Sequence, residues 1–222
     1  MTALATGLTA LPPAERHEGA GHDDGVRLAV LIGAAAVVFS GLYLLSDLIE
    51  LSQGGFSTLQ LALTYVAEAA IPIVVLGLFA VQWPRIGLLG LVGAVAYAYT
   101  FVFFTGTVVY ALVDHADDWD ALTSRLGAWM AVHSVLMVLA GVMFASAVIR
   151  ARVLPRWTGV TLIVGMVLMT VTSALPAAAQ TMSAAVRDVA FAGMGLALLR
   201  SSPQLAIDAL PHTQTSPGTV GS

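Results

Sequence analysis

One long segment without charge constrains this chain more than any other feature. Residues 86–113 include no charged side chain, and most of them are Leu, Val, Ala, Phe or Gly. A helix needs about 20 predominantly apolar residues to cross a hydrocarbon core of about 30 Å. The segment therefore predicts a transmembrane helix.

The composition extends this prediction to the whole chain of 222 residues. Hydrophobic residues make up 58% and charged residues 10%, against about 45–50% and about 25% in soluble domains. The mean hydropathy is +0.89, which reflects more apolar surface than a soluble interior can bury. These values exclude a soluble globular enzyme, a nucleic-acid-binding protein and a disordered chain. We expect an all-α, multi-pass membrane helix bundle.

Two residue types are missing from the chain. All nine basic residues are Arg, so chemistry that needs a lysine, such as a Schiff base, is excluded. The chain also has no Cys, which excludes disulfides, thiolate metal sites and thiol nucleophiles.

Six segments are long and apolar enough to be predicted as spans. They cover residues 28–50, 58–82, 86–114, 122–149, 157–180 and 183–199, within a transmembrane domain at 26–200. The last is the weakest prediction, because Arg187 and Asp188 interrupt it. Residues 1–25 have no apolar stretch of the kind a secretory signal needs. We expect 1–25 and 201–222 to be disordered cytoplasmic tails.

The arginines predict the orientation of the bundle. If the N-terminus is cytoplasmic, the outer side holds only Arg125 and Arg187, and the inner side holds Arg16, Arg27, Arg85, Arg150, Arg152, Arg156 and Arg200. Basic residues are enriched in cytoplasmic loops. We therefore expect both termini on the cytoplasmic side of a bacterial inner (plasma) membrane.

Polar residues recur at helical spacing in the half of each span that is predicted to face outward. Residues 40, 43, 47 and 50 share one face of the first span, and Gln60, Thr64 and Glu68 share one face of the second. Counting 1.5 Å per residue places Glu68 and His133 roughly 15 Å below the outer boundary. At that depth a carboxyl must be protonated or paired with a cation, and a functional role is the default interpretation.

A bundle can turn these faces toward one polar pocket in its outer half. The catalytic candidates are Glu68, Asp188, His133 and Asp47. The substrate-binding candidates are Tyr43, Glu50, Thr64, Tyr65, Thr107, Trp129, Thr170 and Arg187.

Several candidates have a structural alternative. Arg187 and Asp188 are compatible with an ion pair that joins the last span to the first or second. Asp47 and Glu50 lie near enough to the interface to be simply hydrated. A lone His on a membrane helix often forms a hydrogen bond between helices. For His133 both this structural role and a functional role stay open.

The acidic loop at residues 114–120 resembles a cation site, with four Asp and one His. Its spacing does not match the calcium loop or the Asp-rich motif of soluble prenyl-diphosphate enzymes. Acidic residues outside and Arg inside explain the loop more simply. We predict neither a metal nor a cofactor.

Glu68 in the second span and Asp188 in the last resemble, at a coarse level, the carboxylates of the integral-membrane terpene cyclases. These small polytopic proteins protonate a polyprenyl alkene or epoxide, and they generally have seven helices rather than six. The resemblance implies an isoprenoid substrate and a carboxyl that donates a proton.

Three functions remain open from the sequence. The first is an enzyme that acts on a lipid or isoprenoid with Glu68 as acid or base, because a carboxyl in an apolar cavity can donate a proton at neutral pH. The second is a proton- or cation-linked carrier of small solutes, with a relay of Glu68 and His133. The third is a non-catalytic membrane regulator. The expected partners are membrane lipids and, as an option, a second copy of the chain in a homodimer.

Overall fold

The computed structural model describes residues 16–208, and within them the side chains of 25–176 and 178–201. This part of the chain has no strand. Its seven helices are α1 (Arg16–Gln53), α2 (Thr58–Gln82), α3 (Gly87–Val113), α4 (Trp119–Leu126), α5 (Ala128–Ala151), α6 (Arg156–Thr172) and α7 (Ala177–Asp208). The predicted tails at 1–15 and 209–222 lie outside the described residues, whereas 16–25 and 201–208 continue α1 and α7.

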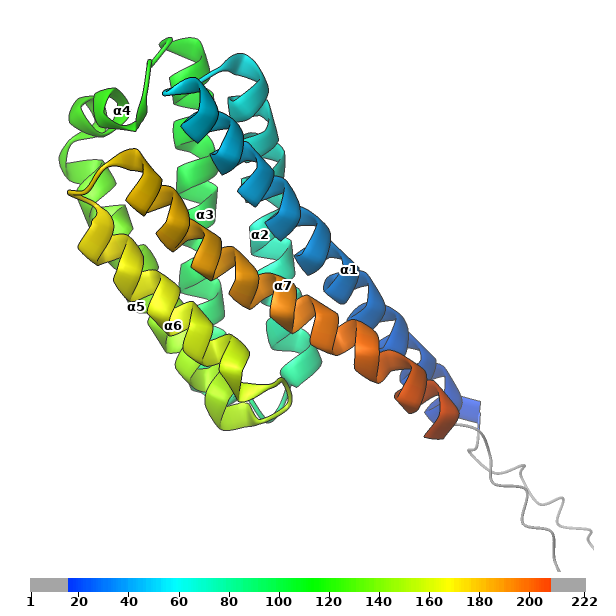
Figure 1. Cartoon of the computed structure of the whole chain (residues 1–222). Coiled ribbons are helices and arrows are strands. Elements are labelled where there is room, and N and C mark those ends of the chain that lie inside the picture. Colours follow the sequence, from blue (N-terminus) through cyan, green and yellow to red (C-terminus); the bar gives the residue numbers. More distant parts are fainter. Residues whose placement is uncertain (1–15, 209–222) are drawn as a thin grey trace, which may run out of the picture.

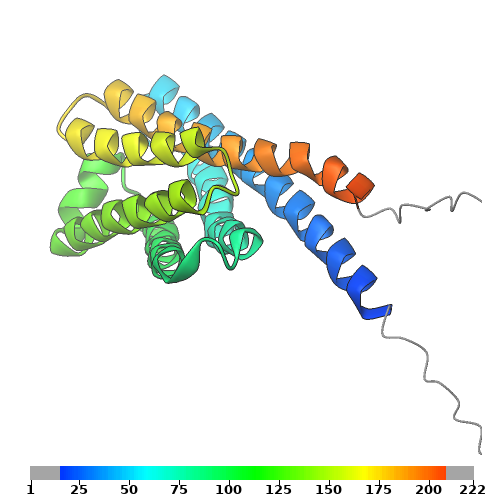
Figure 2. The same cartoon turned by 90° about the horizontal axis from the view of Figure 1, so that it is seen from below.

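The six longer helices form a closed ring. Each packs against the next in the order α1, α2, α3, α5, α6 and α7, and α7 returns to α1. The α1–α2 and α6–α7 connections lie at the same end of the bundle as α4, and the α2–α3 and α5–α6 connections lie at the other (Figure 1). The beginning of α1 and the end of α7 extend past the other helices at that second end (Figure 1). The view from below shows that these two ends diverge (Figure 2).

Five helices are long and apolar enough to cross a membrane: α1, α2, α3, α5 and α7. Their outward surfaces carry large apolar side chains, including Leu31, Ile73, Val102 and Leu139, each more than half exposed. An apolar surface of this extent belongs in lipid rather than water. The chain is therefore an all-α protein of the multi-pass membrane type.

The predicted fourth span differs from the structure. Residues 122–149 were expected as one helix, but the chain forms the short helix α4 and then α5. Gly127 separates the two with φ +50, a conformation that glycine adopts without steric cost. The side chain of Asp118 caps α4 by accepting a hydrogen bond of 2.8 Å from the amide of Ala121. The membrane-length helix therefore begins at Ala128.

The last two predicted spans, 157–180 and 183–199, also have different bounds in the structure. Helix α6 ends at Thr172, and its 17 residues extend only about 25 Å. Pro176 explains the early end, because a proline disfavours helical conformation in the residue before it. Helix α7 begins at Ala177, so the segment with the weakest prediction is part of a membrane-length helix.

Glycines set the closest approaches between helices. A Cβ atom added to Gly195 in α7 would lie 2.5 Å from the carbonyl oxygen of Gly33 in α1. One added to Gly93 in α3 would lie 2.6 Å from the amide nitrogen of Phe144 in α5, and one added to Gly165 in α6 would lie 2.8 Å from the amide nitrogen of Arg187 in α7. Small residues permit such contacts between membrane helices, and they bring α7 close to both of its neighbours.

Candidate functional site

A hydrogen bond between α1 and α2 lies at the centre of the buried polar residues. The hydroxyl of Tyr43 donates to Oε1 of Glu68 over 2.8 Å. Glu68 is only 4% exposed, and its second oxygen, Oε2, is buried without a hydrogen-bond partner. Oε1 of Glu68 is therefore held by a hydrogen bond, and Oε2 is still able to form one.

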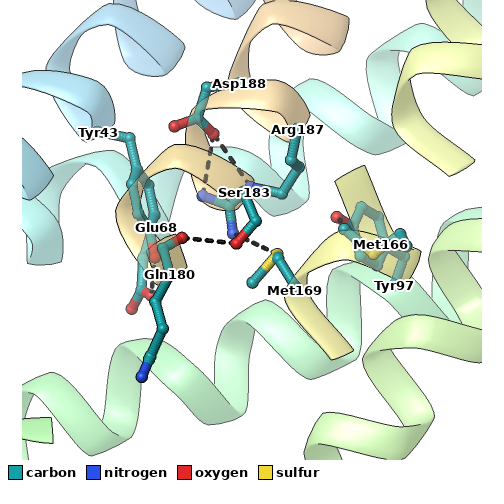
Figure 3. Close-up of polar contacts among 9 residues, drawn as sticks. All are labelled: Tyr43, Glu68, Tyr97, Met166, Met169, Gln180, Ser183, Arg187 and Asp188. Carbon is teal, nitrogen blue, oxygen red and sulfur yellow. Dashed lines mark hydrogen bonds and ion pairs between the residues drawn. The ribbon is translucent and has the colours of Figure 1, made fainter. Parts of the chain in front are cut away.

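Arg187 and Asp188 of α7 lie beside this pair (Figure 3). Nε and Nη2 of Arg187 donate to Oδ1 of Asp188 over 3.0 and 2.9 Å. Both residues are buried, at 2% and 4% exposure. Such a pair must compensate the desolvation of two charges. The ion pair stays within one helix, so it does not join α7 to another helix as the structural alternative supposed.

The Arg187 guanidinium makes its contacts between helices with aromatic rings. Its central carbon lies 4.4 Å from the ring centroid of Tyr43 in α1 and 5.9 Å from that of Phe101 in α3. Its Nη1 approaches the sulfur of Met169 in α6 at 4.0 Å. A guanidinium over an aromatic face is attracted by the ring quadrupole. Arg187 thus links α7 to three other helices of the ring.

Three residues of this group lie at one depth. Tyr43, Glu68 and Arg187 are each ten residues from a helix end at the same end of the bundle, namely Gln53, Thr58 and Ala177. At 1.5 Å per residue this is roughly 15 Å. Because α2 begins at Thr58, as predicted, the distance from its start to Glu68 equals the distance expected from the sequence.

Asp47 lies one turn from Tyr43 on α1, nearer the end of the bundle. It is half-buried, and its Oδ2 is buried without a hydrogen-bond partner. It interacts electrostatically with Asp188 and Arg187. We call Tyr43, Asp47, Glu68, Arg187 and Asp188 the acid cluster, in which three carboxyls face one cation.

A second polar network joins α1 and α2 nearer that end of the bundle. The side-chain amide of Gln60 donates to Glu50 and to Thr64, each over 3.1 Å, and Thr64 shares a short hydrogen bond with Ser46. Glu50 and Thr64 therefore hold the two helices together beside the acid cluster, rather than within it.

The structure places His133 away from the acid cluster. Its Nε2 lies 3.1 Å from the hydroxyl of Tyr99, its Nδ1 lies 2.8 Å from the carbonyl oxygen of Trp129, and its ring stacks on Phe103 at 3.6 Å. Because α5 begins at Ala128, His133 is roughly 8 Å from the helix start, rather than the 15 Å counted from residue 122. It serves the interface of α3 and α5, as the hydrogen-bond interpretation supposed.

Four further candidates lie outside the cluster. Tyr65, Trp129 and Thr170 are exposed on the outward surfaces of α2, α5 and α6. Thr107 is buried, and its hydroxyl donates to the carbonyl of Phe104 in its own helix.

Sequence reasoning missed Phe101 and Met169, which contact Arg187. Phe101 follows Tyr97 by four residues and so shares a face of α3 with it. That spacing marks an interior position and gives no sign of the cation.

The acidic loop has structural contacts. Asp114 forms an ion pair with Arg125, and the carbonyl of Asp117 accepts a hydrogen bond of 2.8 Å from Phe56 in the α1–α2 connection. Across the described residues, no three His, Asp or Glu side chains are placed to hold a metal ion.

Two cavities lie elsewhere in the bundle. A groove of about 520 Å³ is lined by α3 and α5. A smaller cavity of about 190 Å³ lies between the α1–α2 and α3–α4 connections, beside Phe56 and His115. The acid cluster lines neither of them.

Comparison with known proteins gave no relative: no family model, no curated protein and no solved structure matches the chain.

Proposed function

We propose that this membrane protein is an enzyme that transfers a proton to a lipid-soluble substrate of the isoprenoid class, with Glu68 as the proton donor. The observation that carries the proposal is the difference in hydrogen bonding between the two oxygens of the Glu68 carboxyl. Oε1 of Glu68 is held by Tyr43, while Oε2 is buried and unpartnered. A buried polar atom without a partner calls for an explanation, and a catalytic role is one explanation that fits a carboxyl in this position.

The acid cluster supplies what such a step requires. The proton on Oε2 moves to a carbon of a substrate double bond, and the pair of electrons of that bond forms the new C–H bond. Glu68 is then a carboxylate, and the neighbouring Arg187 and the Tyr43 hydroxyl stabilise its charge. When the substrate cation loses a proton, Glu68 takes one back, and the net result is an isomerised or cyclised isoprenoid.

The surroundings of the site suit an apolar substrate. The residues next to the cluster include Phe101 and Met169, and the helices that carry it present apolar side chains to the outside. Access of a substrate requires that α1, α2 or α7 separate locally, because Glu68, Arg187 and Asp188 are buried.

A test uses the protein in liposomes with a polyprenyl alkene or epoxide. Wild-type protein is expected to convert the substrate to an isomer of changed chromatographic retention and equal mass. Glu68→Gln is expected to abolish conversion while the folded protein stays abundant. Asp120→Asn, which changes an exposed carboxyl to an amide in the same way, serves as the matched control and keeps full activity. Equal activity of Glu68→Gln and wild type would sink the proposal.

A proton-linked carrier is the second candidate, favoured by the position of Asp47. This member of the acid cluster lies one turn nearer the end of the bundle than Tyr43, and it keeps a buried oxygen without a partner, so it suits a group that passes protons to Glu68. A pH-sensitive dye inside the liposomes separates the two functions. A carrier moves protons without any change in the lipid, and an enzyme changes the lipid without proton flux.

A further inference from the structure

Four exposed arginines gather at the end of the bundle opposite α4. Arg85 lies in the α2–α3 connection, and Arg150, Arg152 and Arg156 lie at or beside the α5–α6 connection. Both connections are at this end (Figure 1). The side chains of all four residues are exposed. We call these four residues the arginine patch.

The packing of α3 on α5 brings the two parts of the patch to a similar level. The helices are in close contact where Gly93 meets the backbone of Phe144. Arg85 is eight positions from Gly93 and Arg150 is six positions from Phe144, both toward this end of the bundle. At 1.5 Å per residue α3 and α5 are about 40 and 36 Å long, against a hydrocarbon core of about 30 Å. Their ends therefore reach the level of the lipid headgroups.

No described carboxylate pairs with the patch. Every Asp and Glu whose side chain is described belongs to the acid cluster or to the loop at 114–120, or is Glu50. The ion pairs among the described residues are those of Arg125 and Arg187. Enrichment of arginine on one side of the membrane is common, but it does not require three of them around one short connection. The patch is thus a concentration of positive charge that the described part of the chain leaves uncompensated.

The backbone at Arg152 gives a second indication that its charge is used. This residue follows the end of α5 with φ +55, in the left-handed region that glycine adopts without steric cost. Gly127 occupies the same region at the other end of α5. An arginine in this conformation is strained, and the turn itself has no need of its side chain. A role for the guanidinium outside the turn explains why it is there.

The surroundings of the patch suit a lipid better than a free anion. Trp83 and Trp157, next in sequence to Pro84 and Arg156, are 59% and 52% exposed, and tryptophan is typical of the membrane–water interface. Leu88, near the start of α3, is 71% exposed. A ligand here meets guanidinium groups at headgroup level and apolar side chains beside them. Guanidinium groups bind phosphate oxygens in bidentate geometry.

We propose that the arginine patch binds the headgroup phosphate of an anionic phospholipid, whose acyl chains lie against the apolar outward surface of the bundle. A zwitterionic headgroup brings its own cation close to the arginines, so the patch prefers a lipid with net negative charge. The patch is at a different place from the acid cluster, and the inference is independent of the role of Glu68.

The experiment uses tryptophan fluorescence of the full-length protein in phosphatidylcholine vesicles. Trp119→Phe and Trp129→Phe together leave Trp83 and Trp157 as the two tryptophans of the chain. A minor fraction of the lipid is replaced by a lipid with brominated chains, which quenches tryptophan on contact. Brominated phosphatidylglycerol is expected to quench about twofold more than brominated phosphatidylcholine. Both leaflets carry the probe, so the direction of insertion does not affect the result.

A reciprocal pair of substitutions is the matched control. Trp83→Phe with Trp157→Phe leaves the two tryptophans at the α4 end of the bundle, away from the patch. The two brominated lipids are expected to quench this protein equally.

Arginine variants connect the preference to the patch. Arg152→Gly removes one guanidinium and fits the left-handed conformation, so thermal unfolding is expected at the same or a higher temperature, while the extra quenching by phosphatidylglycerol falls. The triple variant Arg150→Gln, Arg152→Gly and Arg156→Gln is expected to abolish it. Higher salt is expected to reduce it in the protein with the intact patch.

Three results would overturn the inference. Equal quenching by the two lipids with the patch intact would mean that the arginines select no headgroup. An undiminished preference in the folded triple variant would place the lipid elsewhere. Loss of the preference when inorganic phosphate replaces chloride at equal ionic strength would assign the patch to a free anion. If the triple variant does not fold, Arg152→Gly takes its place, and an undiminished preference in that variant counts against the proposal.

Discussion

The Tyr43–Glu68 pair is the residue-scale feature on which the candidate site depends. Both side chains were selected from the sequence because they recur at helical spacing on the first two spans. Their direct hydrogen bond was not predicted, since periodicity gives the face of a helix but not its rotation against a neighbour. The same limit hid the contact of Arg187 with Phe101. The count for His133 differs for another reason, because α5 begins at Ala128 rather than at residue 122.

Removal of the Tyr43 hydroxyl tests this hydrogen bond. Tyr43→Phe keeps the ring beneath Arg187 but leaves both oxygens of Glu68 without a hydrogen-bond donor. The free energy of unfolding is expected to fall by about 1 kcal/mol, measured by denaturant titration in mixed micelles. Tyr65→Phe, on the exposed surface of α2, is the matched control and is expected to show no change. An equal effect of the two substitutions would contradict the assignment.

The Arg187–Asp188 pair gives a second prediction at this scale. Arg187→Gln leaves the buried carboxyls of the acid cluster without their cation, and a loss of stability of about 3 kcal/mol is expected. Adding Asp188→Asn to this variant is expected to restore part of the loss, because one of those carboxyls is then neutral. A double-mutant cycle in the same micelles measures the coupling. Strictly additive losses would show that the two residues act independently.

At the scale of helices, the sequence predicted α2 and α3 to within a residue at each end. Ser57 caps α2 by accepting from the amide of Gln60, and continuous apolar sequence defines α3. The breaks at Gly127 and before Pro176 were missed for a common reason. Apolar residues continue across both breaks, so hydropathy alone predicts an uninterrupted helix at each. The backbone conformation at Gly127 and before Pro176 nevertheless ends the helix.

Helix contacts at glycine are testable in the same way. Gly195→Ala places a Cβ 2.5 Å from the Gly33 carbonyl oxygen, so α1 and α7 must separate, and a loss of about 1–3 kcal/mol in stability is expected. Gly41 lies in α1 with open space around it, so Gly41→Ala is expected to leave the stability unchanged or to raise it slightly. Thermal unfolding of both variants checks the difference, and a loss of the same size in each would rule out the close crossing.

At the scale of the whole molecule, a ring of six helices encloses an interior that holds both an apolar core and the acid cluster. Composition predicted the membrane class and the all-α fold. It could not predict that the polar faces of α1, α2 and α7 meet in one buried cluster, because that depends on the order of helices around the ring. It also could not reveal the groove, which arises where α3 and α5 meet.

The predicted orientation is tested by labelling single cysteines, since the chain has none of its own. Asp117→Cys, in the α3–α4 connection, is expected to react with a membrane-impermeant maleimide in intact cells. Val153→Cys, in the α5–α6 connection at the opposite end, is expected to react only after the membrane is opened. The reverse pattern would place both termini outside.

The most direct test of the proton-transfer proposal is the deuterium content of the isoprenoid product formed in heavy water. If Glu68 protonates a carbon–carbon double bond, each product molecule carries one deuterium at the protonated carbon after incubation with wild-type protein. The Glu68→Gln protein is expected to give no deuterated product. Deuterium at the same carbon with Glu68→Gln, or product without deuterium from the wild-type protein, would contradict the role assigned to this carboxyl.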